Sequence, residues 1–388
     1  MRKYCGTPRE TIPLKVMDFF VDIYASLFFK KRPRNYSVTS PKRVLIASLG
    51  HLGDALTVTY LFPIIKKKYP DIIIDLLAPS WCAPVNEHNP YIDRTIYIDH
   101  YQTNRRKING REKLAQFYST FRAAIPLLQQ HSYDYYIDVR YSDAVAHFVL
   151  PFIKTGRAMG FARRGLGGLL DIEFDVPDGE FHHFDMYFML LREMGITGTL
   201  ADVEPYFPIA PGVTTGRIAE KTTLPTAPYL MVFPESGGEQ KQLSAAFWAA
   251  VLNDLLAKTG YNVLLCGQTT LSQQILVQVE APLRNRITDT SGKINIHELA
   301  LLSQQATYAL TLDSFPEHLC SIFCKTITVY KSVGYPFFPL ANLPVYLIHN
   351  HKASIGLPFE RNNVETVYVA HPESAEVKEL IVNRIINH

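Results

Sequence analysis

From residue 43 onward, short apolar runs alternate with longer stretches of helical periodicity. The first runs predict buried strands at 43–48, 71–78, 94–99 and 133–140. Helices are predicted between them over 55–70 and 111–130, followed by a helical stretch over 142–156 and a glycine-rich basic loop over 158–171. Strands that alternate with helices favour a parallel sheet. The first half is therefore expected to be an α/β domain.

A second series of the same kind begins near residue 228. Strands are predicted at 228–234, 261–267, 286–292, 308–313 and 325–331, with helices between them. The stretch 206–227 is rich in Pro, Thr and Gly and is predicted to be a linker. We expect two doubly wound α/β domains, 42–205 and 228–388, that face each other across a cleft, with ligands at the carboxyl ends of the strands.

The segment 1–41 has a different pattern. An amphipathic helix is predicted over 11–32, with one narrow polar stripe made of Lys15, Asp18, Asp22, Ser26 and Lys30. The opposite apolar face holds Phe19, Phe20, Ile23, Leu27 and Phe28. Charged residues interrupt the apolar run, which argues against a spanning helix, and no signal peptide pattern is present. Two interpretations stay open: an anchor on a membrane surface, or a helix that docks on the protein itself.

Charge is concentrated at this end of the chain. Residues 1–43 contain ten Lys and Arg against three acids, a balance of +7, although the whole chain of 388 residues carries only +3. The overall charge argues against nucleic acid as a partner. With 47% hydrophobic and 19% charged residues, the composition is that of a soluble globular protein. The five cysteines lack CxxC spacing and are expected to be buried thiols in a reducing compartment rather than metal ligands.

The loop after the first predicted strand reads SLGHLGDALTV, residues 48–58. Gly50 and Gly53 allow the backbone to turn and approach a ligand closely. Asp54 lies near the start of the next helix, where an acid can simply cap the helix. Residue spacing alone leaves both a capping and a functional interpretation open for Asp54.

Three loops occupy equivalent places in the second domain. The stretch 233–241 contains Ser236, Gly237 and Lys241, which together suit a phosphate. The turn at 288–299 contains Glu298, either a ribose ligand or an ordinary first-turn acid. The third loop, 312–319, holds three candidates at a strand end and the following helix N-terminus: Asp313, Ser314 and His318. No clustered metal ligands and no Walker A, GxSxG, HExxH or GxGxxG motif are present.

Six segments in order resemble glycosyltransferase family 9, the ADP-heptose:lipopolysaccharide heptosyltransferases. They include RVLIASLGHLGDALTV, RAMGFARR, HHFDMYFMLLREMGI, FPESGGEQK, DTSGKINIHELALLSQQA and LTLDSFPEHLCSIFCKTITVYKS, and they cover residues 42–345. The resemblance implies the GT-B fold, with an acceptor-binding first domain and a second domain that binds a nucleotide sugar. It also implies an inverting transfer of a sugar, heptose in the family, to a lipopolysaccharide core or related cell-envelope glycan.

The resemblance assigns roles to matching positions. Asp54 matches the acid of the family's LGD motif, which acts as general base on the acceptor hydroxyl. Lys241 matches the lysine that meets the donor diphosphate. The 288–298 loop matches the nucleoside pocket, and Asp313, Ser314 and His318 match the D-[ST]-G-x-x-H element beside the donor. A metal is not required if lysine and helix N-termini stabilise the diphosphate. No cofactor besides the nucleotide sugar, ADP-heptose in the family, is therefore expected.

The sequence departs from the family pattern on the donor side. Phe315 and Pro316 follow Asp313 and Ser314 where the family has glycine, and Gln-Leu-Ser follows Lys241. These departures leave the donor sugar open and support an alternative, a catalytically inactive binding or scaffold protein attached to a membrane.

On the acceptor side, the sequence suggests contacts with an anionic glycan or glycolipid. Arg163 and Arg164 lie in the glycine-rich loop, Arg140, Arg105 and Arg106 are nearby in sequence, and His51 lies in the same loop as Asp54. Solvated surface charge is the alternative for the arginines. A lipid-linked acceptor and the helix at 11–32 together predict a cytoplasmic protein that is peripheral on the inner face of the bacterial cytoplasmic membrane.

Overall fold

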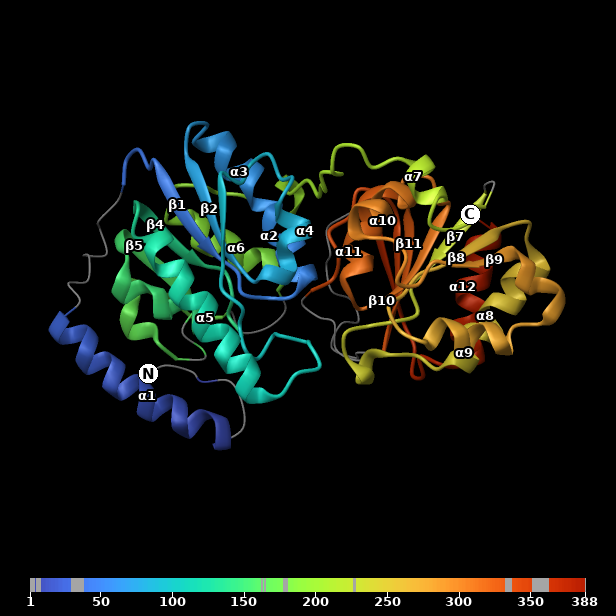
Figure 1. Ribbon diagram of the computed structural model, residues 1–388, viewed down its shortest axis with the longest axis horizontal. Coiled ribbons are helices and arrows are strands. Elements are labelled where there is room, and N and C mark those ends of the chain that lie inside the picture. Colours follow the sequence, from blue (N-terminus) through green and yellow to red (C-terminus); the bar gives the residue numbers. More distant parts are fainter. Residues whose placement is uncertain are drawn as a thin grey trace. The chain divides into compact units, whose positions relative to one another are not determined.

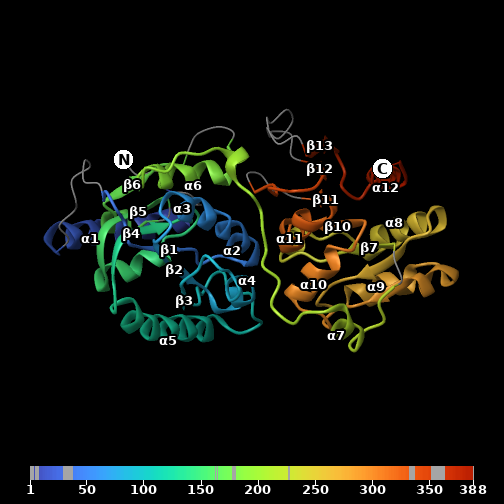
Figure 2. The ribbon, with the colours of Figure 1, turned by 90° about the horizontal axis from the view of Figure 1, so that it is seen from above.

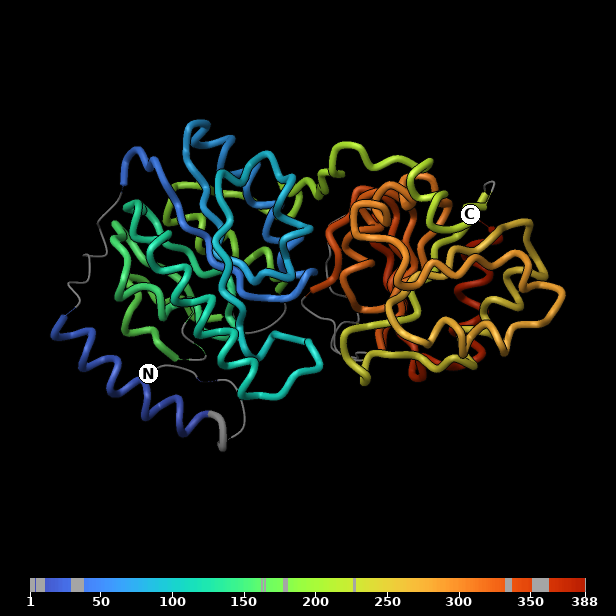
Figure 3. Tube along the Cα trace, in the orientation of Figure 1, coloured from blue at the N-terminus to red at the C-terminus, as the bar shows by residue number. Residues whose placement is uncertain are grey.

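The computed structural model describes residues 4, 8–28, 38–161, 163, 165–176, 181–225, 228–331, 337–350 and 363–387. The chain forms two compact units, Met1–Val203 and Glu204–His388 (Figures 1 and 3). Each unit contains one parallel sheet with helices, which confirms the predicted α/β class.

The sheet of the first unit has the order β3-β2-β1-β4-β5-β6. Its strands are β1 (Arg43–Ala47), β2 (Ile73–Ala78), β3 (Arg94–Tyr97), β4 (Ser132–Asp138), β5 (Lys154–Phe161) and β6 (Ile172–Phe174). The chain runs from β1 outward to β3 and then returns to the other side of β1 with β4. The direction of winding therefore reverses between β1 and β4, the place where open α/β sheets bind ligands.

Helices cover both faces of this sheet. Figure 2 shows α5 (Gly110–Leu128) on one side of the sheet and α3 (Leu61–Lys68) and α6 (His183–Arg192) on the other. The other helices of this unit are α1 (Pro8–Phe28), α2 (Leu52–Thr59) and the single turn α4 (Ala83–Asn86). Short 3₁₀ segments are η1 (Ser80–Cys82), η2 (Val145–Phe152), η3 (Gly167–Leu169) and η4 (Leu200–Asp202).

Three local expectations for this unit were wrong. The single helix predicted over 55–70 is two helices, α2 and α3, which meet at Tyr60. Pro63 explains the break, because it has no N–H to donate to the carbonyl of Thr59 and its ring crowds that carbonyl. The stretch 158–171 is not all loop, since its beginning completes the buried strand β5, and 142–156 contains η2 rather than an α-helix.

The sheet of the second unit has the order β13-β12-β11-β10-β7-β8-β9. Its strands are β7 (Tyr229–Val232), β8 (Asn262–Leu265), β9 (Ile287–Asp289), β10 (Tyr308–Leu312), β11 (Lys325–Tyr330), β12 (Val345–His349) and β13 (Val364–Tyr368). The winding reverses between β7 and β10. Residues after these two strands are therefore the candidates for ligand binding in this unit.

The helices of the second unit are α7 (Thr215–Ala219), α8 (Ala245–Lys258), α9 (Leu271–Gln278), α10 (Ile296–Ser303), α11 (Phe315–Phe323) and α12 (Ala375–Asn387), with 3₁₀ segments η5 (Glu239–Lys241) and η6 (Ala281–Arg286). Trp248 on α8 is fully buried in the main core of this unit. Cys82, Cys266, Cys320 and Cys324 are buried free thiols.

The boundary between the units falls between Val203 and Glu204, close to the end of the predicted first domain. The described part of the predicted linker packs on the second unit. Ile218 of α7 is fully buried in a core cluster of that unit, and the backbone N–H of Ala210 donates to His297 Nδ1 at 3.1 Å. This segment is therefore built into the second unit rather than extended free of it.

Candidate functional site

Asp54 lies in the first turn of α2, directly after the loop that leaves β1. His51 is the N-cap residue of α2, and its backbone N–H donates to Asp54 Oδ2 at 2.7 Å. This contact is half of a capping box, so Asp54 does cap α2. Capping does not exclude a further role for its carboxylate.

The same box occurs a second time in this unit. His182 is the N-cap of α6, and its backbone N–H donates to Asp185 Oδ2 at 2.8 Å. Asp54 and Asp185 thus share the residue pattern His-x-x-Asp and the local geometry. Any difference in role between Asp54 and Asp185 must therefore come from the residues around each carboxylate.

The distinguishing feature is Arg140, which follows β4, the strand beside β1. Its Nη1 lies 3.0 Å from Asp54 Oδ2, and its Nε lies 2.6 Å from Asp143 Oδ2. The Asp54 side chain is 27% exposed, whereas those of Arg140 and Asp143 are 13% and 10% exposed. An ion pair therefore bridges the two strand ends at which the winding reverses. Sequence reasoning named Arg140 only as a nearby cation; its position two residues after β4 was the signal.

Gly50 makes room for this ion pair. A Cβ at Gly50 would lie 2.1 Å from Arg140 Nη1 and 2.5 Å from Asp54 Oδ2, too close for any side chain. The backbone carbonyl of Gly50 accepts a hydrogen bond from Trp81 Nε1 at 3.1 Å, which fixes the loop. The sequence predicted close approach of Gly50 to a ligand, whereas the close neighbours in the structure are the side chains of Asp54 and Arg140.

The pair sets the charge state of Asp54. Burial by itself would raise the pKa of Asp54, but the Arg140 guanidinium and the His51 N–H outweigh it and leave this pKa below its usual value. Arg140 itself has a raised pKa, since the carboxylates of Asp54 and Asp143 outweigh its burial. Asp54 is thus held as a carboxylate, with both of these contacts on Oδ2.

Two buried acid and histidine pairs support the site. His100 Nε2 lies 3.4 Å from Asp143 Oδ1, and His147 Nε2 lies 3.0 Å from Asp138 Oδ2 with both side chains fully buried. Burial raises the pKa of Asp138 despite its histidine partner. Neither pair was foreseen from sequence, because each joins residues that only the sheet brings together.

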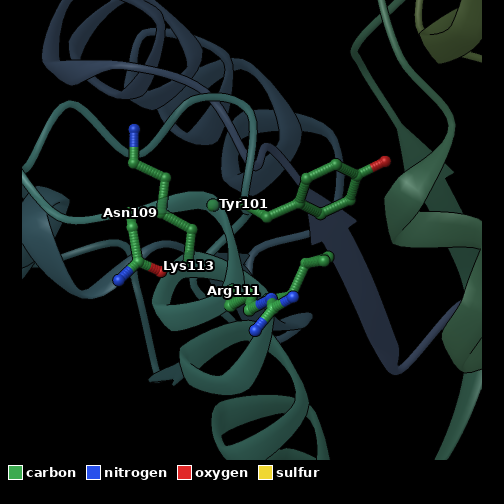
Figure 4. A pocket seen from close by; sticks show the side chains of 6 residues that line it. Tyr101, Asn109, Arg111 and Lys113 are labelled. Atoms are coloured by element: carbon green, nitrogen blue, oxygen red, sulfur yellow. The ribbon is translucent and has the colours of Figure 1, made fainter.

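A hollow of about 610 Å³ lies at the N-terminus of α5. Figure 4 shows Asn109, Arg111 and Lys113 from this end of the helix together with Tyr101, and Gly110 and Leu114 complete the lining. The Tyr101 ring stacks on His100 with centroids 5.1 Å apart. The hollow is therefore linked through His100, Asp143 and Arg140 to Asp54.

The predicted acceptor residues are only partly placed. Arg163 is half-buried and follows β5, so it lies at the same sheet edge as Asp54 but two strands away. Arg164 lies outside the described residues. His51 contributes the backbone N–H described above.

In the second unit, the structure brings together Lys241 and Asp313. Lys241 Nζ lies 2.5 Å from Asp313 Oδ2, with side chains 31% and 10% exposed. Lys241 ends the loop after β7 and Asp313 follows β10, so this pair also lies where the winding reverses. The carboxylate orients the lysine at the sheet edge.

The N-terminus of α11 follows Asp313. Ser314 is the N-cap residue, and its hydroxyl donates to the carbonyl of Leu312 at 3.2 Å. Pro316 in the first turn lacks an N–H, which leaves this helix end with one donor fewer for an anion. His318 is largely buried, with Nε2 3.5 Å from Glu317 Oε1.

Glu317 is a buried acid that sequence reasoning did not single out. Its Oε2 accepts a hydrogen bond from the Tyr330 hydroxyl at 2.7 Å. Burial and the neighbouring Asp313 raise the pKa of Glu317 well above its usual value. These two effects favour the protonated form of Glu317 beside the lysine and aspartate pair.

The remaining donor-side candidates make local contacts. The Ser236 hydroxyl donates to the carbonyl of Gly238 at 2.8 Å, which shapes the loop that contains Gly237. Glu298 forms a capping box with Asn295 and pairs with Lys221 Nζ at 2.6 Å. The first-turn cap accounts for Oε2 of Glu298, and the Lys221 ion pair accounts for Oε1.

No group of three or more His, Cys, Asp or Glu side chains that could hold a metal ion is found among the described residues.

Comparison with known proteins identifies the family of this chain. The family described as glycosyltransferase family 9 (heptosyltransferase) matches residues 122–355, which are 234 of the 388 residues. The chain belongs to glycosyltransferase family 9.

Relatives extend the match of this family 9 chain beyond that range. Lipopolysaccharide heptosyltransferase 3 of Escherichia coli is 23% identical over 282 residues, 69% of this chain and 77% of that protein. A solved family 9 glycosyltransferase of Veillonella parvula has a TM-score of 0.67 at 17% identity and covers 90% of this chain and 99% of its own. The structure of E. coli ADP-heptose lps heptosyltransferase II has a TM-score of 0.65 at 17% identity, covering 89% of this chain and 98% of its own.

The resemblance inferred from six sequence segments is thereby confirmed, as are the predicted fold and glycosyltransferase activity. The family match contains Arg140, Lys241, Glu298, Asp313 and His318 but not Asp54. The assignment of a role to Asp54 therefore rests on its motif and on the geometry of its ion pair.

Proposed function

We propose that this glycosyltransferase moves a heptose, or a closely related sugar, from an ADP-linked donor to an anionic cell-envelope glycolipid such as a lipopolysaccharide core. The names of the relatives, lipopolysaccharide heptosyltransferases and an ADP-heptose enzyme, support the substrate class. The observation that carries the chemistry is the ionised Asp54, fixed by Arg140 and by the helix cap where the sheet winding reverses.

Asp54 acts as the general base. Its Oδ2 is occupied by the His51 N–H and by Arg140, and Oδ1 accepts no hydrogen bond from the described residues. We assign Oδ1 to the acceptor hydroxyl. The depressed pKa makes Asp54 a weak base but keeps it ionised at neutral pH, so proton transfer is completed as the new bond forms.

The transfer is a single displacement. The acceptor hydroxyl loses its proton to Asp54, its oxygen forms a bond to the anomeric carbon, and the bond from that carbon to the donor diphosphate breaks. The electron pair leaves with the diphosphate, so the product has the inverted configuration. Charge on the leaving group is stabilised by Lys241, which Asp313 orients, and by the N-terminus of α11.

The hollow at α5 suits an anionic part of the acceptor. Arg111 and Lys113 line it, and residues 105–107 of the preceding loop are Arg, Arg and Lys. Tyr101 gives the hollow an aromatic wall against which a sugar ring can pack. Arg163 follows β5 at the same sheet edge and extends the cationic surface.

Donor binding tests the proposal. Titration calorimetry with ADP, GDP and UDP should show saturable binding of ADP that is weakened in Lys241→Met. Binding of UDP or GDP in preference to ADP would contradict the assigned nucleotide. The anomeric configuration of the product, read by NMR, tests inversion: retention would contradict a single displacement.

A further inference from the structure

The helix α1 docks on the first unit through one narrow edge, which contains Asp18 and the apolar residues Met17, Val21 and Ala25. Asp18 is 2% exposed, and its Oδ1 accepts the backbone N–H of Leu166 at 2.6 Å while Oδ2 accepts the Tyr4 hydroxyl at 2.6 Å. Ala25 is buried, and Met17 and Val21 pack against the core cluster of this unit. The helix is therefore fixed along its length to the body of the unit.

The glycine-rich loop after β5 is shaped to receive this edge. Gly165 has φ +99°, and a Cβ there would lie 3.0 Å from Asp18 Oδ1. A Cβ at Gly168 would lie 2.3 Å from Asp22 Oδ1. Leu166, between them, has φ 61°, a left-handed conformation that branched carbon side chains rarely adopt. A loop built this closely around two aspartates shows that the docked position of α1 is specified.

Docking by this narrow edge leaves the wide apolar face of α1 in water. Its large apolar side chains are all exposed: Ile12 60%, Val16 54%, Phe19 62%, Phe20 64%, Ile23 44%, Tyr24 43%, Leu27 70% and Phe28 71%. The usual amphipathic helix of a globular protein is oriented the other way, with its apolar stripe toward the core. Contiguous apolar surface of this kind marks an interaction site.

We propose that the exposed face of α1 binds the surface of an anionic lipid bilayer, with the helix axis parallel to the membrane plane. Among the described residues no helix is both long and apolar enough to span a bilayer. Eight exposed apolar side chains, three of them Phe, suit insertion to the acyl boundary. The docking contacts fix the axis of α1 on the surface of the first unit. The exposed apolar face can therefore meet a bilayer only with the helix lying flat on it.

Charge selects the bilayer over a second copy of the chain. The acids of α1 with described side chains, Asp18 and Asp22, both lie against the glycine loop, whereas Lys15 is exposed. Ten Lys and Arg against three acids in residues 1–43, four of the basic residues at 30–34, would repel the same segment of another copy. Anionic headgroups are attracted instead, by about fivefold in affinity for each such cation at the surface.

A tryptophan placed on the face tests the insertion directly. Phe20→Trp should become quenched by brominated lipid in phosphatidylethanolamine and phosphatidylglycerol vesicles. Val277→Trp, at a residue 69% exposed on α9 of the second unit, is the matched control and should stay unquenched. Equal quenching at both positions, or at neither, would overturn the proposal.

Loss of affinity gives the second test. Burying one large apolar side chain is worth at least about tenfold in partitioning, so Phe20→Gln with Leu27→Gln should lower vesicle binding about a hundredfold. Val277→Gln should leave it unchanged, and both variants should keep the circular dichroism spectrum and the cooperative thermal melt of the unsubstituted protein, which excludes misfolding. Light scattering tests whether a second copy of the chain covers the face instead. If the protein is a dimer that the double substitution dissociates, while vesicle binding is unchanged, the proposal is overturned. This test does not depend on the proposed donor or acceptor.

Discussion

Replacing Asp54 by Asn separates its two roles, capping and catalysis. The amide oxygen can still accept the His51 N–H, so the cap survives, but the side chain can no longer take a proton. Arg140 keeps its 2.6 Å contact with Asp143, so no buried cation is left unpaired. We expect the free energy of unfolding to fall by only about 1–2 kcal/mol from the weakened ion pair, roughly 2–8 °C in melting temperature.

Turnover should fall far more than stability does, by about 100- to 10,000-fold, the usual contribution of a general base. Asp185→Asn is the matched control, since it makes the same change in the same His-x-x-Asp box on α6 without the arginine. Steady-state transfer and thermal melts on both variants form the assay. If Asp54→Asn keeps normal turnover, or if Asp185→Asn loses as much, Asp54 is a cap and not the base.

Three further variants test the neighbouring contacts. Gly50→Ala places a methyl group where Arg140 Nη1 lies and should lower turnover about a hundredfold by displacing the ion pair; normal kinetics would refute the close packing. Arg140→Met removes the cation that holds down the pKa of Asp54, so the acid limb of the kcat/KM profile should move to higher pH, and an unmoved limb would contradict the assignment. Lys241→Met should raise the Kd for ADP about 10- to 100-fold in calorimetry, whereas an unchanged Kd would place the diphosphate elsewhere.

Local sequence patterns sufficed for the strands next to the site. The run at 43–48 and the glycines after it place Asp54 at the carboxyl end of β1, as predicted. Pro63 is a sequence signal for a break in the helix predicted over 55–70. The apolar periodicity continues on both sides of Tyr60, however, and predicts one unbroken helix. The stretch that became β5 contains two glycines, which lowered its apparent strand propensity, although the strand lies between β4 and β6 and its last five residues are buried.

The two ion pairs Asp54–Arg140 and Lys241–Asp313 could not be read from the sequence, because each joins distant segments. Arg140 lies 86 positions from Asp54, and Lys241 lies 72 positions from Asp313 (313 − 241). Only the strand order, with β4 beside β1 and β10 beside β7, makes these residues neighbours. The orientation of α1 is a similar case: the helical wheel finds its two faces, but the loop at 165–168 decides which of them meets the protein.

Transfer itself is the most direct test of the proposed activity. The protein is incubated with ADP-heptose and a lipopolysaccharide core that lacks its terminal heptose, and the acceptor is analysed by mass spectrometry. We expect the acceptor to gain one heptose as one ADP is released, and both signals to fall at least about a hundredfold in Asp54→Asn. An acceptor that stays unmodified while the same preparation binds ADP tightly would contradict the proposed activity.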